Sequence, residues 1–186
     1  MGKMPKSTGF NKGYHDKQFS NPYYSTIKFC DWLVELQALN KKTKSICDMG
    51  CGKGANLYYM AKRFPQCRFF GKDIDKKVIK KGKIFLQNAS IKNIKLQVGD
   101  IEKKQKSTNK TKFDGIVSLQ TISWLSDYKK VIAAMSAWRP KWISFTSLFY
   151  DGPIEAKTII SEFQADGRTK KDFITILILF RLLNST

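Results

Sequence analysis

Residues 45–54 restrict the possible folds of this chain more than any other stretch. A short apolar run that contains Asp48 is followed by three glycines at every second position, and then by a helical pattern. The three glycines are Gly50, Gly52 and Gly54. A glycine turn between a buried strand and a helix lets backbone N–H groups approach a ligand that side chains would block. The spacing is G-x-G-x-G, which differs from the G-x-G-x-x-G fingerprint of dinucleotide-binding proteins. The segment therefore predicts a strand, a ligand-binding turn and a helix, in that order.

Apolar strands and helical patterns alternate along the rest of the chain. Strands are predicted over 45–49, 68–73, 95–99, 113–119 and 142–149. Helices are predicted over 26–40, 54–64, 76–88, 127–138 and 153–165. This alternation favours an α/β fold with a doubly wound, mostly parallel sheet and helices on both faces. We expect one domain over 21–165, preceded by a loose N-terminal segment 1–20 and followed by an atypical tail 166–186.

The chain is strongly basic, with a formal net charge of +19 from 34 lysines and arginines against 15 acidic residues. Only five of the basic residues are arginine, the side chain best suited to paired contacts with phosphates and bases. The lysines are spread along the chain rather than gathered in one arm. We therefore expect a lysine-rich solvated surface and no nucleic-acid partner.

The apolar stretches and the cysteines indicate the cellular compartment in which we expect the protein. The longest apolar stretch, 173–180, is much shorter than the roughly 20 residues of a membrane-spanning helix. The N-terminus has no apolar segment of the kind found in secretory signals. The cysteines form no C-x-x-C pair; they are Cys30, Cys47, Cys51 and Cys67. We expect a cytoplasmic protein with reduced thiols, no membrane partner and no metal site.

Three aspartates follow or end predicted strands. They are Asp48, Asp73 and Asp100. The carboxyl ends of parallel strands meet at one edge of the sheet, where ligands bind in open α/β folds. Asp73 lies 19 positions after Gly54, close to the spacing of the acid that holds ribose hydroxyls in nucleotide-binding folds. Asp100 is placed to accept a hydrogen bond from the amino group of an adenine.

Each of these acids has a simpler interpretation, because aspartate is common as a helix cap or in a turn. Asp75 precedes the helix 76–88 and is assigned to such a cap. For Asp73 and Asp100 together, ligand binding is the better interpretation. For Asp48, a structural role in holding the glycine turn is as good as direct contact with a ligand.

The segment Asp48-x-Gly50-x-Gly52-x-Gly54 resembles motif I of the class I S-adenosylmethionine-dependent methyltransferases. The segment 71–75 is similar to the second motif of that family and the segment 98–101 to its adenine-binding motif. The resemblance covers about residues 25–150. It implies a Rossmann-like fold and S-adenosylmethionine as cofactor. The cofactor-binding residues that it implies are Asp48, Gly50, Cys51, Gly52, Gly54, Asp73, Ile74, Asp100, Ile101, Leu119 and Gln120.

The segment after the fourth strand bears on the acceptor of the methyl group. Enzymes that methylate amino groups of nucleic-acid bases carry an Asp/Asn-Pro-Pro-aromatic motif there, whereas this chain has Ser-Leu-Gln-Thr over 118–121. The resemblance therefore implies a small-molecule acceptor, with a hydroxyl of a sugar or metabolite as the candidate group. Candidate acceptor-pocket residues are Tyr14, Tyr23, Tyr24 and Trp124, and for Trp124 packing in the core is an equal alternative.

A catalytic base is not evident from the sequence. His15 is the only histidine and could serve a hydroxyl acceptor, although an ordinary surface histidine is favoured at that position. Two other functions stay open. One is an inactive remnant that binds the cofactor without turnover, and the other, less favoured, is an RNA methyltransferase recruited by the basic surface.

The tail departs from the family pattern. Members usually close the sheet with two further strands, but only 173–180 offers a sixth strand and nothing offers a seventh. Codons allowed for residues 172–183 also encode, in another frame, a polar string rich in tyrosine. We therefore expect that the last strands are missing and that the tail is frameshifted at the Thr169-Lys170-Lys171 run.

Overall fold

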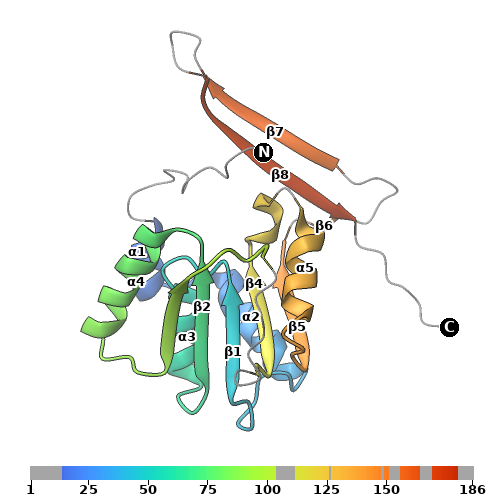
Figure 1. Cartoon of the computed structure of the whole chain (residues 1–186). Coiled ribbons are helices and arrows are strands. Elements are labelled where there is room, and N and C mark those ends of the chain that lie inside the picture. The colour runs from blue at the N-terminus through green and yellow to red at the C-terminus, as the bar shows by residue number, and fades with distance from the viewer. Residues whose placement is uncertain are drawn as a thin grey trace, which may run out of the picture.

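A sheet of five parallel strands, in the order β3-β2-β1-β4-β5, organises the molecule (Figure 1). Its strands are β1 (Ser45–Met49), β2 (Arg68–Asp73), β3 (Ile94–Val98), β4 (Gly115–Leu119) and β5 (Trp142–Thr146). The order reverses between β1 and β4, and ligands of open α/β sheets bind at the carboxyl ends of strands beside such a reversal. The predicted fold class is confirmed.

The computed structural model describes residues 14–103, 112–125, 127–147, 149–150, 156–163 and 169–179. Side chains are described for 17–103, 112–125 and 127–147.

Helices cover both faces of the sheet, but unequally. They are α1 (Tyr14–Ser20), α2 (Tyr24–Glu35), α3 (Ala55–Arg63), α4 (Lys76–Asn88), the short 3-10 helix η1 (Ile122–Trp124) and α5 (Tyr128–Ser136). One apolar core packs α2, α3, α4 and Phe19 of α1 against the sheet. The other core packs α5 and η1 against the opposite face. The alternation of side chains along a strand supplies both cores, because Ile46 of β1 belongs to the first and Cys47 to the second.

Helix α4 begins where the sequence predicts it. The Asp75 carboxylate accepts hydrogen bonds from the backbone N–H groups of Lys77 and Val78, at 2.7 and 3.2 Å. These bonds satisfy donors that the first turn of a helix leaves unpaired. The assignment of Asp75 as a helix cap is confirmed.

The first helix corrects one expectation. Residues 14–20, which we expected to belong to a loose segment, form α1. Phe19 of this helix is buried, and its ring stacks on Phe85 of α4 with 3.7 Å between centroids. The ring of Tyr58 from α3 meets Phe19 edge-on. One aromatic side chain thus anchors a polar segment to the core. Residues 1–13 lie outside the described part of the chain.

The prediction of a helix over 153–165 is wrong. Strand β7 (Ala156–Phe163) pairs antiparallel with β8 (Thr169–Leu179), and β6 (Phe149–Tyr150) pairs parallel with β8. The β-branched run 158–160 favours extended backbone once a partner strand is present. The strand expected over 173–180 overlaps β8, but it belongs to this second sheet rather than to the main one. In Figure 1 the β7–β8 hairpin extends beyond the main sheet, and β8 contacts η1.

Two findings concern membranes and cysteines. Among the described residues, no helix is long and apolar enough to cross a bilayer. The four cysteines are free and buried.

Candidate functional site

The glycine loop after β1 has a backbone that side chains would not tolerate. Gly50, Gly52 and Gly54 have φ angles of 88°, 55° and 85°, in the left-handed region that favours glycine. A Cβ on Gly50 would also lie 2.3 Å from the side chain of Thr121. The N–H groups of Gly50 and Cys51 donate to the Lys72 carbonyl of β2, at 2.8 and 3.0 Å. The loop is therefore fixed across the ends of β1 and β2.

Asp73 ends β2 directly beside this loop. Its Oδ2 accepts a hydrogen bond from Gly52 N at 2.8 Å, and its Oδ1 accepts one from Asp75 N at 2.9 Å. A carboxylate offers about four lone-pair sites, so about two remain for a ligand. A vicinal diol such as that of ribose fits this remaining capacity. The carboxylate thus holds the loop in position while retaining acceptor sites.

Asp48, which lies two positions before Gly50 of the loop, is 1% exposed, and neither of its carboxyl oxygens has a hydrogen-bond partner among the described residues. Burial, and secondarily the charge of Asp73, raises its pKa to about 8. Near neutral pH this carboxyl group is largely protonated. Burial first, followed by the charges of Asp48 and Asp73, also raises the pKa of the Cys51 thiol well above its usual value. An orphaned buried carboxyl group is a costly feature that a cationic ligand group nearby would compensate.

A cavity of about 400 Å³ opens beside the glycine loop at the reversal of strand order. It is lined by Gln18, Tyr23, Ser25, Thr26, Gly50, Cys51, Gly52, Asn56, Leu119, Gln120, Thr121, Trp124 and Thr146. These residues come from α1, the start of α2, the glycine loop, the start of α3, the ends of β4 and β5, and η1 with the segment before it. The cavity is therefore built where parallel strands end and helices begin.

Hydrogen bonds between the lining residues fix the shape of the cavity. The Thr26 hydroxyl donates to Asn56 Oδ1 at 2.8 Å, which joins α2 to α3. The Thr121 hydroxyl donates to the Gly50 carbonyl at 3.1 Å, which joins the segment after β4 to the glycine loop. Gln120 N donates to Thr146 Oγ1 at 3.1 Å, which joins the ends of β4 and β5.

Gln120 has an uncommon backbone conformation, with a φ of 54°. Such conformations in residues other than glycine are costly and gather at ligand sites. Its N–H also donates to the Thr146 carbonyl at 3.0 Å, so the neighbouring strand maintains the conformation.

A second group of residues continues the site on the other side of the loop. The N–H of Gly99 donates to the Asp73 carbonyl at 2.9 Å, which brings the end of β3 against the end of β2. Asp100 follows, with Oδ1 accepting from Glu102 N at 3.0 Å. Ile74 is 49% exposed, whereas Ile101 is buried. An exposed aliphatic side chain beside two carboxylates suits a planar ring that carries an amino group.

The predicted site residues whose side chains are described divide into three sets. The first set lines the cavity and comprises Gly50, Cys51, Gly52, Leu119, Gln120, Tyr23 and Trp124. The second set lies outside the cavity lining, in the glycine loop and at or just after the ends of β1, β2 and β3, and comprises Asp48, Gly54, Asp73, Ile74, Asp100 and Ile101. Tyr24 belongs to neither, because it is 73% exposed and its ring lies beside Lys28 instead. The side chains of Tyr14 and His15 lie outside the described part of the chain.

Sequence reasoning missed five polar lining residues, which are Gln18, Ser25, Thr26, Asn56 and Thr146. Asn56 lies in the first turn of the helix after the glycine loop, so its position offered a signal. Thr26 and Thr146 reach the cavity only through the packing of α2 and β5. Within the described residues, no cluster of three or more His, Cys, Asp or Glu side chains could hold a metal ion.

Comparison with known proteins points to one family. Residues 40–162 match the family model described as a methyltransferase domain. An uncharacterized protein of Rickettsia prowazekii (strain Madrid E) is 34% identical over 108 residues, which is 58% of this chain and 42% of that protein. The (S)-coclaurine N-methyltransferase of Papaver somniferum is 26% identical over 128 residues, which is 68% of this chain and 35% of that enzyme.

Solved structures share the fold. Coclaurine N-methyltransferase bound to N-methylheliamine and SAH superposes with a TM-score of 0.53 at 18% identity, covering 74% of this chain and 37% of that chain. PKMT2 from Rickettsia typhi in complex with AdoHcy gives a TM-score of 0.50 at 27% identity, covering 65% of this chain and 23% of that chain. The chain spans less than half the length of the curated relatives described above.

Proposed function

The chain belongs to the methyltransferase-domain family, and we propose that it transfers a methyl group from S-adenosylmethionine to a small-molecule acceptor. The observation that carries this proposal is the glycine loop joined to Asp73 by the 2.8 Å hydrogen bond from Gly52 N. Gly50, Cys51 and Gly52 of the loop line the cavity, and the carboxylate keeps about two acceptor sites beside them. A nucleoside attached to a polar chain fits this combination.

Different residues of the chain would bind different parts of the methyl donor. Asp73 would accept hydrogen bonds from the ribose hydroxyls, and Ile74, Asp100 and Ile101 would surround the adenine. The glycine loop, Leu119 and Gln120 would hold the methionine end, whose ammonium group would compensate the orphaned carboxyl group of Asp48. The bound donor supplies an electrophilic methyl group on a sulfonium.

Positioning is the main contribution that we assign to the protein. Methyl transfer to a good nucleophile is an in-line displacement, and holding the reactants in line and away from water supplies most of its acceleration. We assign the acceptor to the part of the cavity that Tyr23 and Trp124 line, next to the part that holds the methionine end of the donor. The candidate acceptor group is a hydroxyl of a metabolite, and a nucleic-acid acceptor is not proposed.

Calorimetric titration with S-adenosylhomocysteine tests this proposal. We expect the wild-type chain to bind and Asp73→Ala to bind at least about 30-fold more weakly, because two charge-assisted hydrogen bonds are lost. Asp31→Ala is the matched control, since Asp31 is a half-buried, ion-paired aspartate that lies outside the cavity lining.

Three outcomes would count against the proposal. No binding by the wild-type chain would refute the cofactor assignment. Equal binding by wild type and Asp73→Ala would refute the placement of the site. Binding with no methyl transfer to any acceptor would favour a non-catalytic cofactor-binding protein.

A further inference from the structure

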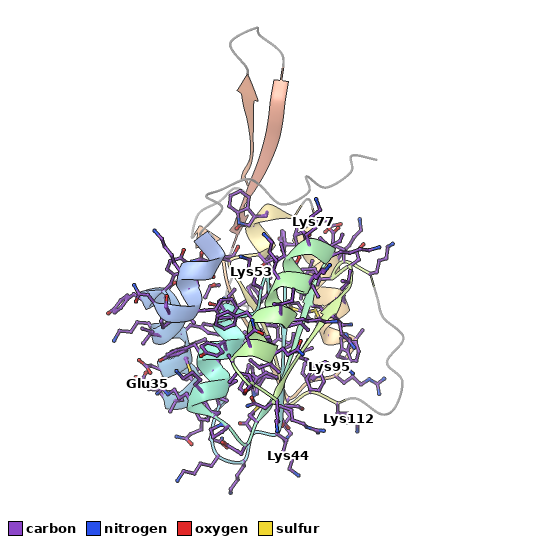
Figure 2. The ribbon with its side chains drawn as sticks, turned by 90° about the vertical axis from the view of Figure 1, so that its left-hand side faces the viewer. Glu35, Lys44, Lys53, Lys77, Lys95 and Lys112 are labelled. Carbon is purple, nitrogen blue, oxygen red and sulfur yellow. The ribbon has the colours of Figure 1, made fainter. Side chains whose placement is uncertain are left out.

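One side of the molecule carries lysines without acidic residues. Residues 76–99, which include α4 and β3, contain seven lysines and no aspartate or glutamate. All seven lysines are exposed, and five of them belong to α4. Figure 2 views the molecule from this side, with Lys77 of α4 and Lys95 of β3 labelled. The positive charge of this side is not balanced within its own elements, so it attracts acidic groups.

The same side contains a groove between α4 and β3. Its volume is about 390 Å³. The aliphatic side chains that line it are Leu86, Ile91, Ile94 and Leu96, and its charged lining residues are Lys83 and Lys92. The groove therefore offers aliphatic contacts beside two positive charges.

Strand β3 is the outer strand of the main sheet, so one side of its backbone has no partner strand among the described residues. The N–H of Gly99 donates to the Asp73 carbonyl of β2 at 2.9 Å. Backbone groups of successive residues in a strand point to opposite sides. The N–H and C=O groups of Ile94, Leu96 and Val98 therefore point away from β2. A further strand can pair with these groups.

The side chains of β3 alternate between the two faces of the sheet. Leu96 faces α4, because a Cβ on Gly82 of that helix would lie 2.8 Å from it. Ile94 lines the groove with Leu96, whereas Lys95 between them belongs to the opposite face and is exposed. A strand added to this edge would also place alternate side chains toward the groove and toward the face of Lys95. Aliphatic side chains suit the first set, and carboxylates suit the second.

We propose that the edge of β3 binds an extended segment of a partner protein in which aliphatic and acidic residues alternate. The backbone of the segment pairs with β3, its aliphatic side chains enter the groove, and its carboxylates lie near the exposed lysines. A second copy of this chain does not fit, because its own β3 edge would bring seven further lysines against these. RNA has no backbone that continues a sheet, and residues 76–99 contain no arginine to contact it.

Synthetic peptides test the proposal with the full chain. The first peptide alternates four glutamates with three valines, and the second has the same residues in two blocks. Calorimetry in the absence of S-adenosylmethionine measures the affinities. We expect the alternating peptide to bind at least about tenfold more tightly than the blocked one, because only alternation places all valines on one face of a strand. Equal binding of the two peptides, or binding of neither, would overturn the proposal.

Backbone methylation tests the pairing with β3. Two further peptides keep the alternating sequence and carry N-methyl groups either on all valines or on all glutamates. Only one of these two sets of N–H groups can face β3, so we expect one methylated peptide to lose binding and the other to retain it. Unchanged binding of both would show that the backbone does not pair. In NMR spectra, the amide protons of Ile94, Leu96 and Val98 should exchange more slowly when the peptide is bound, whereas those of Lys95 and Gln97, which face β2, should change less.

Charge reversal separates the groove from general attraction to a basic protein. Lys83→Glu combined with Lys92→Glu reverses both charges of the groove and should weaken the alternating peptide at least about tenfold. Lys41→Glu combined with Lys42→Glu is the matched control, because it makes the same change in net charge at two exposed lysines outside the groove. It should keep the affinity within about threefold of the wild type. Thermal unfolding of both variants checks that they fold.

Two further outcomes would overturn the proposal. Equal losses in the two variants would show attraction to the net charge alone. A single-stranded RNA that binds more tightly than the alternating peptide, and loses binding in the groove variant, would assign this side to nucleic acid instead. The cavity that carries the proposed function lies at the reversal of strand order, so binding of S-adenosylhomocysteine tests that function separately.

Discussion

At the residue scale, the buried carboxyl group of Asp48 makes the stability of the fold depend on pH. Its pKa is raised to about 8 in the folded chain, mainly by burial, from an ordinary value of 3.8. Between these values the folded chain holds a proton that the unfolded chain has released. Stability therefore falls as pH rises from about 4 to about 8, and the penalty is complete above that range. The glycine loop is thus built over a group that opposes folding at neutral pH.

Replacing this carboxyl group should remove the penalty. Asp48→Asn keeps the size and removes the charge, so we expect it to raise the free energy of unfolding at pH 8 by at least about 1 kcal/mol. That gain corresponds to roughly 2–4 °C in Tm for a chain of this size. Thermal unfolding of both chains at pH 5 and pH 8 is the measurement, and the Tm difference should be larger at pH 8. A difference independent of pH would show that Asp48 stays ionised.

The same substitution separates stability from binding. If the ammonium group of the methyl donor compensates Asp48, the Asn variant should be more stable at pH 8 and yet bind S-adenosylhomocysteine more weakly. A gain in both properties would assign Asp48 a structural role alone.

At the scale of elements, helix α4 and the glycine loop approach each other so closely that one glycine decides their separation. A Cβ on Gly82 of α4 would lie 2.3 Å from the carbonyl oxygen of Lys53 and 2.8 Å from the side chain of Leu96. The first contact is with backbone, which cannot move without moving the loop. Gly82 therefore sets the position of α4 against the loop that carries the site.

We predict that Gly82→Ala lowers the free energy of unfolding by about 1–3 kcal/mol, because overpacking outweighs the higher helix propensity of alanine. Since the loop must shift, binding of S-adenosylhomocysteine should weaken as well. Lys81→Ala on the exposed side of α4 is the control and should leave both quantities nearly unchanged. Chemical denaturation and calorimetry measure the two effects. A stabilising Gly82→Ala would contradict the close approach.

At the scale of the whole molecule, most of the described lysines lie on the surface. Figure 2 labels exposed lysines at both ends of the main domain, with Lys77 at one end and Lys44 and Lys112 at the other. Lys53 of the glycine loop is buried instead. The cavity itself is uncharged among its described lining residues. A distributed surface charge of this kind keeps a protein in solution but does not form a track for a phosphate backbone.

Nucleic-acid binding should therefore be weak and lost at moderate salt. We expect fluorescence anisotropy with a single-stranded RNA to show binding at about 50 mM salt that disappears by about 200 mM, as for non-specific contacts. A dianionic dye-labelled peptide of similar length serves as a control for general attraction to the positive charge. Tight RNA binding that persists at the higher salt would favour the RNA methyltransferase alternative.

The sequence alone determined the elements that local patterns encode and the order in which they occur. The bounds of β1, β2 and α4 agree with those predicted, since the apolar runs, the glycine turn and the cap at Asp75 each act within a few residues. The strand ends that carry Asp48, Asp73 and Asp100 follow for the same reason, because parallel strands joined by helices must end at one edge.

Only the tertiary structure decided what depends on distant partners. The extended conformation of 156–163 depends on pairing with β8. The position of helix α1 depends on the stacking of Phe19 against Phe85 of α4. The cavity lining depends on Thr26 and Thr146, which come from separate elements. The burial of Asp48 and the exposure of Tyr24 are likewise set by packing. Local propensity specifies where a strand or turn begins, but burial and hydrogen bonding depend on surfaces that meet only when the chain has folded.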